Sequence, residues 1–371
     1  MDEQIFTNIS TIIERDSKSS TYKFALLRGT IDIISENSPF IEINHENVNI
    51  PLGLLVEKWL LYYYPIFETN IAIPQIHGNT RLAFENEFIE TLITNYKNKG
   101  GYSAFYNELR NREIDPAIRS NFIFLIRKVR DTIIKMPMKY IGRSINESYY
   151  SIYNYELKKR ASFSGKPINT NTLIKELGTF TIPKKYYDAF KFIGSFINGT
   201  NSILFNWAKF SVNMSNNSLD VNTVLNEILK DPVTERNVNL SKKLYNEKLN
   251  HEGRLYCVWS GKRIQRYDID HIIPFSVWKN NDLWNLLPTH PKTNSQKGDK
   301  IPSEKLLENQ KQLIMYYWNF LNQTLQDQFI KEINISLIGD KINNWQDIAF
   351  EQLKSNCIYL KNIKGIEEWT M

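Results

Sequence analysis

Five polar residues in the last third of this 371-residue chain have the types and spacing needed to hydrolyse a phosphodiester. Asp270 and His271 are adjacent, Asn285 and Asn294 follow His271 by 14 and 23 residues, and Lys297 comes soon afterwards. A carboxylate is a ligand for a hard metal ion, and a histidine with an ordinary pKa near ~6.5 can act as a base at neutral pH. Carboxamides can position both groups. The pattern therefore indicates a nuclease site.

Short strands and one helix are expected to hold these residues. A strand that starts near Tyr256 breaks at a Ser-Gly turn, and a second strand starts at Tyr267. A long loop and a helix from about Asn294 follow, so the predicted unit is ββα with a metal site between the second strand and the helix. A helix over residues 240–253 precedes this unit, and Ser303 is a plausible N-cap for the next helix.

Over residues 250–303 the chain resembles the HNH endonucleases, also called the ββα-metal family. Three motifs carry the resemblance, in order and at suitable spacing: Asp270-His271 with Pro274, then Asn285-Leu286-Leu287-Pro288, then Asn294-x-x-Lys297. A lone Asp-His pair would be weak evidence, but three ordered motifs within about 30 residues are specific.

The resemblance implies a role for each of the five residues. His271 would be the general base that activates the attacking water, and Asp270 and Asn294 would be the protein ligands of one divalent cation. Asn285 matches the central Asn of the family, whose side chain fixes the loop and hence the geometry of the histidine. Lys297 would hold either the phosphate or the helix.

The metal expected at this site is Mg²⁺ or Mn²⁺. The family name implies a last His where this sequence has Asn294, and oxygen ligands favour these ions over Zn²⁺. Many members also carry two Cys-x-x-Cys pairs that bind a structural zinc. Here the first pair has become Cys257-Val-Trp-Ser, and no second pair follows. No structural zinc is expected, and Trp259 is expected to fill that space.

Two further residues are candidates for a position near the site. Asp268 shares a strand face with Asp270 if the strand alternates regularly, so it is either a partner of the site or a solvated carboxylate. His290 is the only other histidine expected close to the motif. Cys257 and Cys357 are interpreted as core residues.

The chain as a whole is predicted to be α+β. Residues 1–240 form a mainly helical recognition, regulatory or oligomerisation region, with a possible sub-boundary near 150–185, and residues 241–371 form the HNH domain with C-terminal helices. Helices are predicted over 22–33, from Pro51 to a stop at Pro65, over 122–129 and over 184–229, and strands over 151–157 and 178–182.

Charge and composition limit the partners. The net charge is +6, and residues 241–300 hold eleven Lys and Arg against six Asp and Glu, so the excess lies around the motif where a polyanion would dock. No apolar run is long enough to span a membrane. With two cysteines and an acidic start, the chain is expected in the reducing cytoplasm.

The leading hypothesis is a metal-dependent endonuclease that cuts double-stranded DNA. An N-terminal region of this size resembles the sensing part of bacterial restriction or anti-phage nucleases, and it could bind a protein partner or form a homo-oligomer. One alternative is an effector nuclease that a partner or ligand keeps silent. The other, an inactive nucleic-acid-binding protein, is disfavoured by the intact Asp270, His271 and Asn294.

Overall fold

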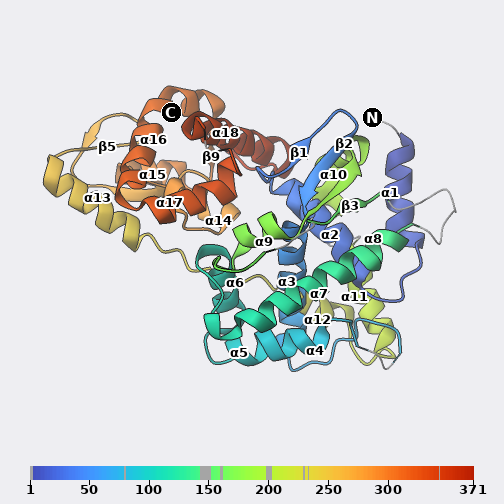
Figure 1. The fold of residues 1–371 in the computed structure, drawn as a ribbon. Helices are drawn as coiled ribbons and strands as arrows, with labels where there is room; N and C mark the ends of the chain where they lie inside the picture. Colours follow the sequence, from blue (N-terminus) through green and yellow to red (C-terminus); the bar gives the residue numbers. More distant parts are fainter. Residues whose placement is uncertain are drawn as a thin grey trace. The chain divides into compact units, whose positions relative to one another are not determined.

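The chain folds into two compact units, each with its own hydrophobic core (Figure 1). The computed structural model describes residues 3–78, 81–142, 152–158, 162–197, 203–228, 230–232, 234–341 and 343–371. The N-terminal unit is Met1–Val233 and the C-terminal unit is Thr234–Met371. Both combine many helices with a few short strands, so the predicted α+β class is confirmed.

The N-terminal unit is mainly helical around one small antiparallel sheet. Its helices are α1 (Glu3–Arg15), α2 (Tyr22–Ser35), α3 (Leu52–Glu68), α4 (Glu85–Phe88), α5 (Thr94–Tyr96), α6 (Gly101–Asn111), α7 (Arg119–Lys135), α8 (Pro137–Tyr140), α9 (Thr170–Glu176), α10 (Lys184–Ile197), α11 (Ile203–Met214) and α12 (Val221–Ile228), with short turns η1 (Ile89–Ile93) and η2 (Pro116–Ile118). The strands are β1 (Glu42–Ile43), β2 (Asn47–Pro51), β3 (Asn154–Glu156) and β4 (Thr179–Pro183), in the order β1-β2-β4-β3.

The predicted strands over 151–157 and 178–182 are present as β3 and β4, but the hairpin of β1 and β2 was missed. Its β2 strand carries two Asn residues, which are rare in strands. The strand forms because it pairs with β4, with Val48 opposite Ile182 and both side chains fully buried. Segments before residue 52 and after residue 153 therefore belong to one sheet. The helical part predicted over 184–229 contains α10, α11 and α12.

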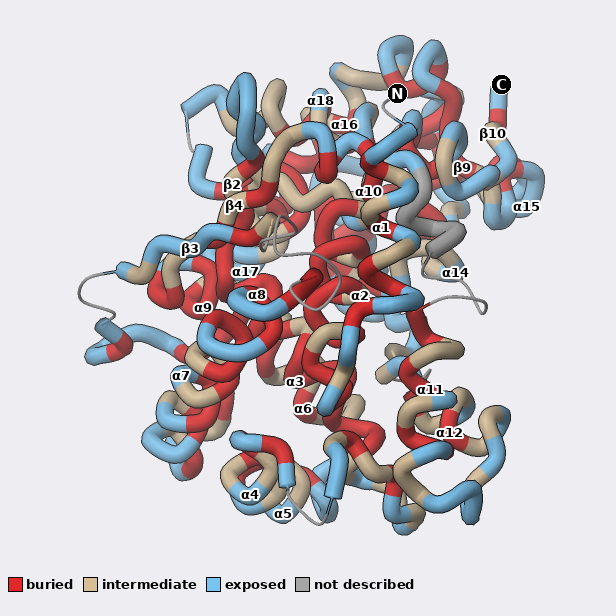
Figure 2. The backbone as a smooth tube through the Cα atoms, turned by 90° about the vertical axis from the view of Figure 1, so that its right-hand side faces the viewer, coloured by how far each residue is buried: buried red, intermediate tan, exposed pale blue. Residues whose placement is uncertain are grey.

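Helix α3 is the centre of the N-terminal core. Fourteen of its 17 residues are buried, because the helix is apolar on nearly all sides. Figure 2 shows α3 mainly in the colour of buried residues. The predicted stop at Pro65 is wrong, since α3 continues to Glu68. Proline removes one helical hydrogen bond, but burial of Ile66 in the next turn favours the helical path. No helix in the described ranges is long and apolar enough to cross a membrane.

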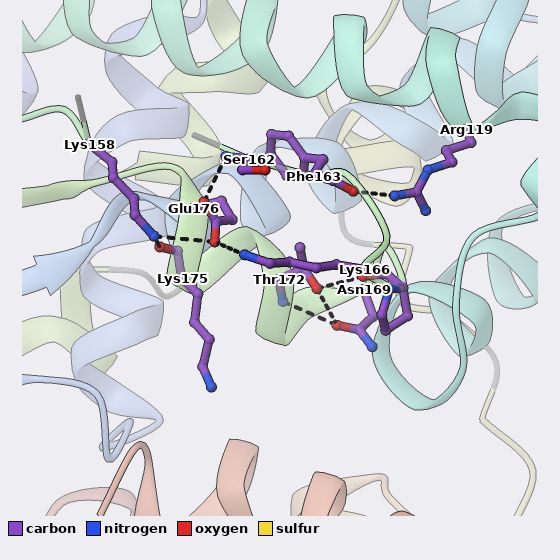
Figure 3. Close-up of polar contacts among 10 residues, drawn as sticks. Arg119, Lys158, Ser162, Phe163, Lys166, Asn169, Thr172, Lys175 and Glu176 are labelled. Atoms are coloured by element: carbon purple, nitrogen blue, oxygen red, sulfur yellow. Dashed lines mark hydrogen bonds and ion pairs between the residues drawn. The ribbon is translucent and has the colours of Figure 1, made fainter. Parts of the chain in front are cut away.

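A buried carboxylate organises the connection into α9 (Figure 3). Glu176, which is 2% exposed, accepts hydrogen bonds from Lys166 Nζ at 2.6 Å, Lys158 Nζ at 3.2 Å and the Ser162 backbone N–H at 3.0 Å. Burial alone would raise the pKa of Glu176, but these donors lower it to about 2. The Asn169 side chain then caps α9 by accepting from the Thr172 N–H. The segment before α9 is therefore fixed by polar contacts.

The C-terminal unit joins three two-stranded sheets to several long helices. In chain order its elements are α13 (Asn239–Glu252), β5 (Leu255–Tyr256), β6 (Arg263–Ile264), β7 (Asp268–His271), α14 (Phe275–Trp278), η3 (Leu283–Asn285), β8 (Leu286–Thr289), α15 (Pro291–Lys297), β9 (Ile301–Pro302), α16 (Glu304–Thr324), α17 (Gln326–Ile333), η4 (Asn334–Ile338), α18 (Trp345–Lys364) and β10 (Glu368–Trp369). Strands β5 and β6 pair antiparallel, as do β7 and β8, whereas β9 and β10 pair in parallel.

The structure corrects the predicted ββα unit in two places. The Asn285–Pro288 segment, expected within a loop, forms η3 and then strand β8, which pairs with β7. All four residues of β8 are buried, so its backbone needs the partners that β7 supplies. The helix begins at Pro291, earlier than Asn294, because the His290 side chain caps it and proline is favourable in a first turn.

Tyrosines from two helices hold these short strands. The hydroxyl of Tyr317 on α16 accepts from the Tyr256 N–H at 2.9 Å and donates to the Tyr256 carbonyl at 2.6 Å. The hydroxyl of Tyr245 on α13 donates to the Leu286 carbonyl at 3.1 Å. The predicted cap at Ser303 is also confirmed, since its Oγ accepts from the Leu306 N–H that starts α16. Flanking helices therefore brace strands too short to be stable alone.

Two carboxyl groups, of the buried Asp282 and the half-buried Glu332, lie close together at the motif loop. Asp282 accepts from Trp284 Nε1 at 3.0 Å and from Ser336 Oγ at 2.9 Å. Glu332 of α17 accepts from the Leu283 N–H at 2.6 Å. Burial, and then the nearby Asp282, raise the pKa of Glu332 to about 8. The loop between α14 and β8 is thus anchored by a carboxyl group whose pKa is raised above its usual range.

Close packing of α3 against α9 makes Gly53 intolerant of a side chain. A Cβ at Gly53 would lie 2.2 Å from the Leu173 carbonyl carbon and 2.3 Å from the Ile174 nitrogen, and these backbone atoms cannot move aside easily. We predict that Gly53→Ala lowers the free energy of unfolding by about 1–3 kcal/mol, measured by chemical denaturation. In Gly29→Ala, the matched control, the one close contact of the new Cβ is with the flexible end of Leu55, and its contacts with Lys58 and Tyr62 are of ordinary length, so a smaller change is expected. Equal effects in the two variants would contradict this account.

Candidate active site

Strand β7 brings Asp270 and His271 to the edge of the C-terminal core. Its pairing with β8 places Asp270 opposite Leu287 and His271 opposite Leu286. Asp268 is exposed, whereas Asp270 and His271 are only 4% and 2% exposed. The strand therefore carries a carboxylate and an imidazole into a largely desolvated position, where each needs polar partners.

Asp270 receives its partners from both sides. Its Oδ2 accepts from Trp259 Nε1 at 2.6 Å, and its Oδ1 accepts from Lys297 Nζ at 3.2 Å. Burial raises the pKa of Asp270, while the Lys297 charge and the Trp259 hydrogen bond lower it. Trp259 lies where the zinc-binding turn of related sequences was expected, and it packs edge-on against Trp369. It therefore acts as a polar support of the carboxylate in addition to filling space.

Lys297, at the end of α15, is fully buried and linked to both motif residues. Besides its ion pair with Asp270, its Nζ donates to the His271 backbone carbonyl at 2.6 Å. This ammonium group is committed to β7, and it is not among the residues that line the pocket described below. Of the two roles implied by the resemblance, these contacts favour holding the helix over holding a phosphate.

Asn285 fixes the turn that follows His271. Its Oδ1 accepts from the Ile273 N–H at 2.8 Å, and its Nδ2 donates to the Ile273 carbonyl at 3.0 Å. The Asn285 backbone carbonyl accepts from the Ile272 N–H at 2.9 Å. The Asn285 side chain, which is 0% exposed, thereby satisfies both backbone polar groups of Ile273. This arrangement fits the positioning role proposed for Asn285.

The His271 ring faces the pocket with both nitrogens free of hydrogen bonds to the described residues. Its ring packs edge-on against Phe275, with centroids 5.5 Å apart. Burial, and then the charge of Arg236, lower the pKa of His271 to about 4, partly offset by the Asn281 side chain. The imidazole is therefore neutral at pH 7, the protonation state in which a nitrogen can accept a proton.

Asn294 faces β7 from α15. Its Nδ2 donates to Asp268 Oδ2 over 3.4 Å, a long contact, so Asp268 touches the site instead of being only solvated. Its Oδ1 accepts no hydrogen bond from the described residues. The carboxamide is consequently oriented by its nitrogen while its oxygen stays available to a ligand.

A pocket of about 150 Å³ brings three of the five predicted residues together. Asp270, His271 and Asn294 line it, whereas Asn285 and Lys297 support it from behind. The complete lining is Arg236, Asp270, His271, Pro274, Phe275, Asn294, Gly298 and Asp299.

Sequence reasoning missed Arg236 and Asp299. Gly298 has a positive φ of 54°, which ends α15 and turns the chain so that Asp299 follows at the pocket. The Gly-Asp pair directly after the last motif was a readable signal for a second carboxylate. Arg236 carries no such signal, because it lies before α13 and far from the motif in sequence.

The lining residues fit a hard divalent cation. Asp270 and Asp299 offer carboxylate oxygens and Asn294 a carboxamide oxygen, the donor types that Mg²⁺ and Mn²⁺ prefer. Each Asp270 oxygen accepts one hydrogen bond and keeps a second lone pair. Within the described residues no cluster of three or more His, Cys, Asp or Glu side chains forms a larger metal site.

His290 and the two cysteines lie outside the pocket lining. His290 is exposed, and its Nδ1 accepts from the Lys292 N–H at 3.2 Å at the start of α15; it does not line the pocket. Cys257 is buried with its Sγ 3.2 Å from Thr289 Oγ1, and Cys357 is buried in the same core. Burial raises the pKa of the Cys357 thiol to about 12, as for an inert core residue.

Comparison with known families agrees with this geometry. Residues 257–303 match the family model of HNH endonucleases. The C-terminal unit thus contains an HNH endonuclease domain, which confirms the resemblance. Members of that family act on nucleic acid and generally use a divalent metal ion.

The N-terminal unit matches a second family. Residues 2–228 match a family described as a domain of unknown function (DUF8808), and because that match covers more than half of the chain, the protein belongs to this family. No solved structure matches the chain.

The paired hydrogen bonds of Asn285 lead to a prediction. Asn285→Ala leaves the buried N–H and carbonyl of Ile273 without partners, so the free energy of unfolding should fall by about 1–3 kcal/mol per group. Chemical denaturation measures this loss. Asn285→Asp keeps an acceptor for the Ile273 N–H but places a buried carboxylate against the Ile273 carbonyl, so it should also lose stability. A wild-type stability for Asn285→Ala would show that the turn after His271 does not depend on this side chain.

Proposed function

We propose that this protein is a metal-dependent endonuclease that hydrolyses phosphodiester bonds of double-stranded DNA. The observation that carries the proposal is the pocket where Asp270, His271 and Asn294 meet, within a segment that matches HNH endonucleases. The excess of lysine and arginine in residues 241–300 supports a polyanionic substrate.

His271 acts as the general base. Its neutral imidazole takes a proton from a water molecule, whose oxygen attacks phosphorus as the bond between phosphorus and the 3′ oxygen breaks. Solvent returns a proton to the leaving oxygen. Asn285 keeps the backbone after His271 in place, so the ring is held at the pocket without reorganisation.

Asp270 and Asn294 would hold one Mg²⁺ or Mn²⁺ ion, which when bound neutralises charge that develops on the phosphate. Lys297 and Trp259 orient the Asp270 carboxylate. The N-terminal unit has its own core and lies outside the HNH segment, so we assign it to substrate recognition, assembly or control.

The direct test incubates the full chain with supercoiled plasmid and Mg²⁺ or Mn²⁺. Nicked and linear products that disappear with EDTA support the proposal. Cleavage that persists in EDTA would overturn the metal dependence, and cleavage confined to RNA would overturn the substrate class. Calorimetric titration with Mn²⁺ gives a second readout, because Asp270→Ala should weaken metal binding whether or not plasmid is cut.

His271→Ala should reduce the Mg²⁺-dependent cleavage rate by about 10²–10⁴-fold, the usual contribution of a general base. Calorimetric Mn²⁺ binding should change little, because His271 is not a proposed ligand. His251→Ala, at an exposed position of α13 outside the pocket, is the matched control and should cut like the wild type. A His271→Ala rate within tenfold of the wild type would remove His271 from the role of base.

A further inference from the structure

Arg236 lies on a short segment that precedes the HNH motif but reaches its pocket. Residues 234–238 belong to the C-terminal unit and come just before α13. Arg236 lines the pocket together with Asp270, His271 and Asn294. Neither the sequence motifs nor the family match, which begins at residue 257, includes this arginine.

Asn281 holds this segment at the pocket from both sides of Arg236. Its Nδ2 donates to the Glu235 carbonyl at 2.9 Å, and its Oδ1 accepts from the Asn237 N–H at 2.9 Å. Asn281 itself belongs to the loop between α14 and η3 and directly precedes the buried Asp282. The backbone on each side of Arg236 is therefore fixed to the catalytic loop by one carboxamide.

The Arg236 guanidinium is exposed and uncommitted. It forms no hydrogen bond or ion pair with any residue in the described ranges, whereas the buried Lys297 ammonium is fully engaged with β7. Its charge is close enough to lower the pKa values of both Asp270 and His271. Among the residues that line the pocket, Arg236 is the only Lys or Arg, so it is the group that an anion entering the pocket would meet.

We propose that Arg236 binds a phosphate oxygen of the nucleic acid at the pocket and that Asn281 is its positioning residue. This inference rests on the proposed function and adds the group that recognises the phosphate. The planar guanidinium can donate two parallel hydrogen bonds to a phosphate, which fixes its orientation as well as neutralising charge. Two hydrogen bonds to the flanking backbone hold the arginine in place before the phosphate arrives.

The first test measures binding and does not depend on cleavage. A fluorescein-labelled 20-base-pair DNA duplex is titrated with full-length His271→Ala protein in EDTA at several KCl concentrations, and Kd is read by anisotropy. Adding Arg236→Ala should weaken binding and reduce the slope of log Kd against log [KCl] by about 0.9, the share of one phosphate contact. An unchanged affinity and slope would overturn the proposal.

The matched control for the loss of charge is Lys305→Ala. Lys305 is exposed on α16, outside residues 241–300, and does not line the pocket, so its removal should leave kcat/KM unchanged. Arg236→Ala should lower kcat/KM by about 10- to 100-fold, the usual range for a hydrogen bond to a charged group. Arg236→Lys keeps the positive charge but loses the planar pair of donors. Compared with Arg236→Ala, it should therefore restore the salt slope more fully than kcat/KM.

The positioning role of Asn281 is tested by a double-mutant cycle. Asn281→Ala should lower kcat/KM in the wild-type background and have little further effect in Arg236→Ala, since it acts through that arginine. Additive losses would show that Asn281 acts by another route, namely through its side chain's interaction with His271. If the wild-type protein cuts no plasmid, the proposed function fails, whereas the EDTA binding series still decides whether Arg236 contacts phosphate.

Discussion

The candidate site depends on one buried ion pair, between Lys297 and Asp270. A carboxylate only 4% exposed loses most of its hydration, and that loss is tolerated only with a cation and a hydrogen-bond donor in place. Lys297 supplies the cation from α15, and Trp259 supplies the donor from the turn after β5. Lys297 also donates to the His271 carbonyl, so these contacts fix β7, the turn that carries Trp259, and α15 to one another. The geometry of the pocket is set by this cluster.

The strands that display the site are too short to explain its rigidity. Each sheet of the C-terminal unit has two strands of two to four residues, and such pairs are marginal in water. The helices compensate, because Tyr317 and Tyr245 bond directly to strand backbone and the aromatic core closes around them. Buried aromatic side chains thus supply the cohesion of a domain whose sheets are minimal.

How much of the fold and the site the sequence could predict depends on how far apart in the chain the interacting residues lie. Asp270, His271 and Asn294 are local motif residues, and the short path from β7 through β8 to α15 is enough to gather them. Arg236 could not be found in this way, because its place depends on two hydrogen bonds from Asn281, far along the chain. The β1–β2 hairpin was missed for a similar reason, since its burial comes from the distant strand β4. The predicted helix stop at Pro65 was wrong because proline is a local signal, whereas the path of α3 is decided by packing on all sides.

The carboxyl group of Glu332 couples folding of the C-terminal unit to proton uptake. The pKa of Glu332 in the folded chain lies above the ordinary value of 4.5, so the native state keeps a proton to higher pH than the unfolded chain does. Stability from this group is complete below about pH 4.5 and is lost as the pH rises through the pKa of the folded state. His271 acts in the opposite sense, but only below its ordinary pKa of 6.5, where the unfolded chain gains the proton. The contact between Glu332 and the loop that carries Asn281 and Asn285 therefore stabilises the folded chain less as the pH rises.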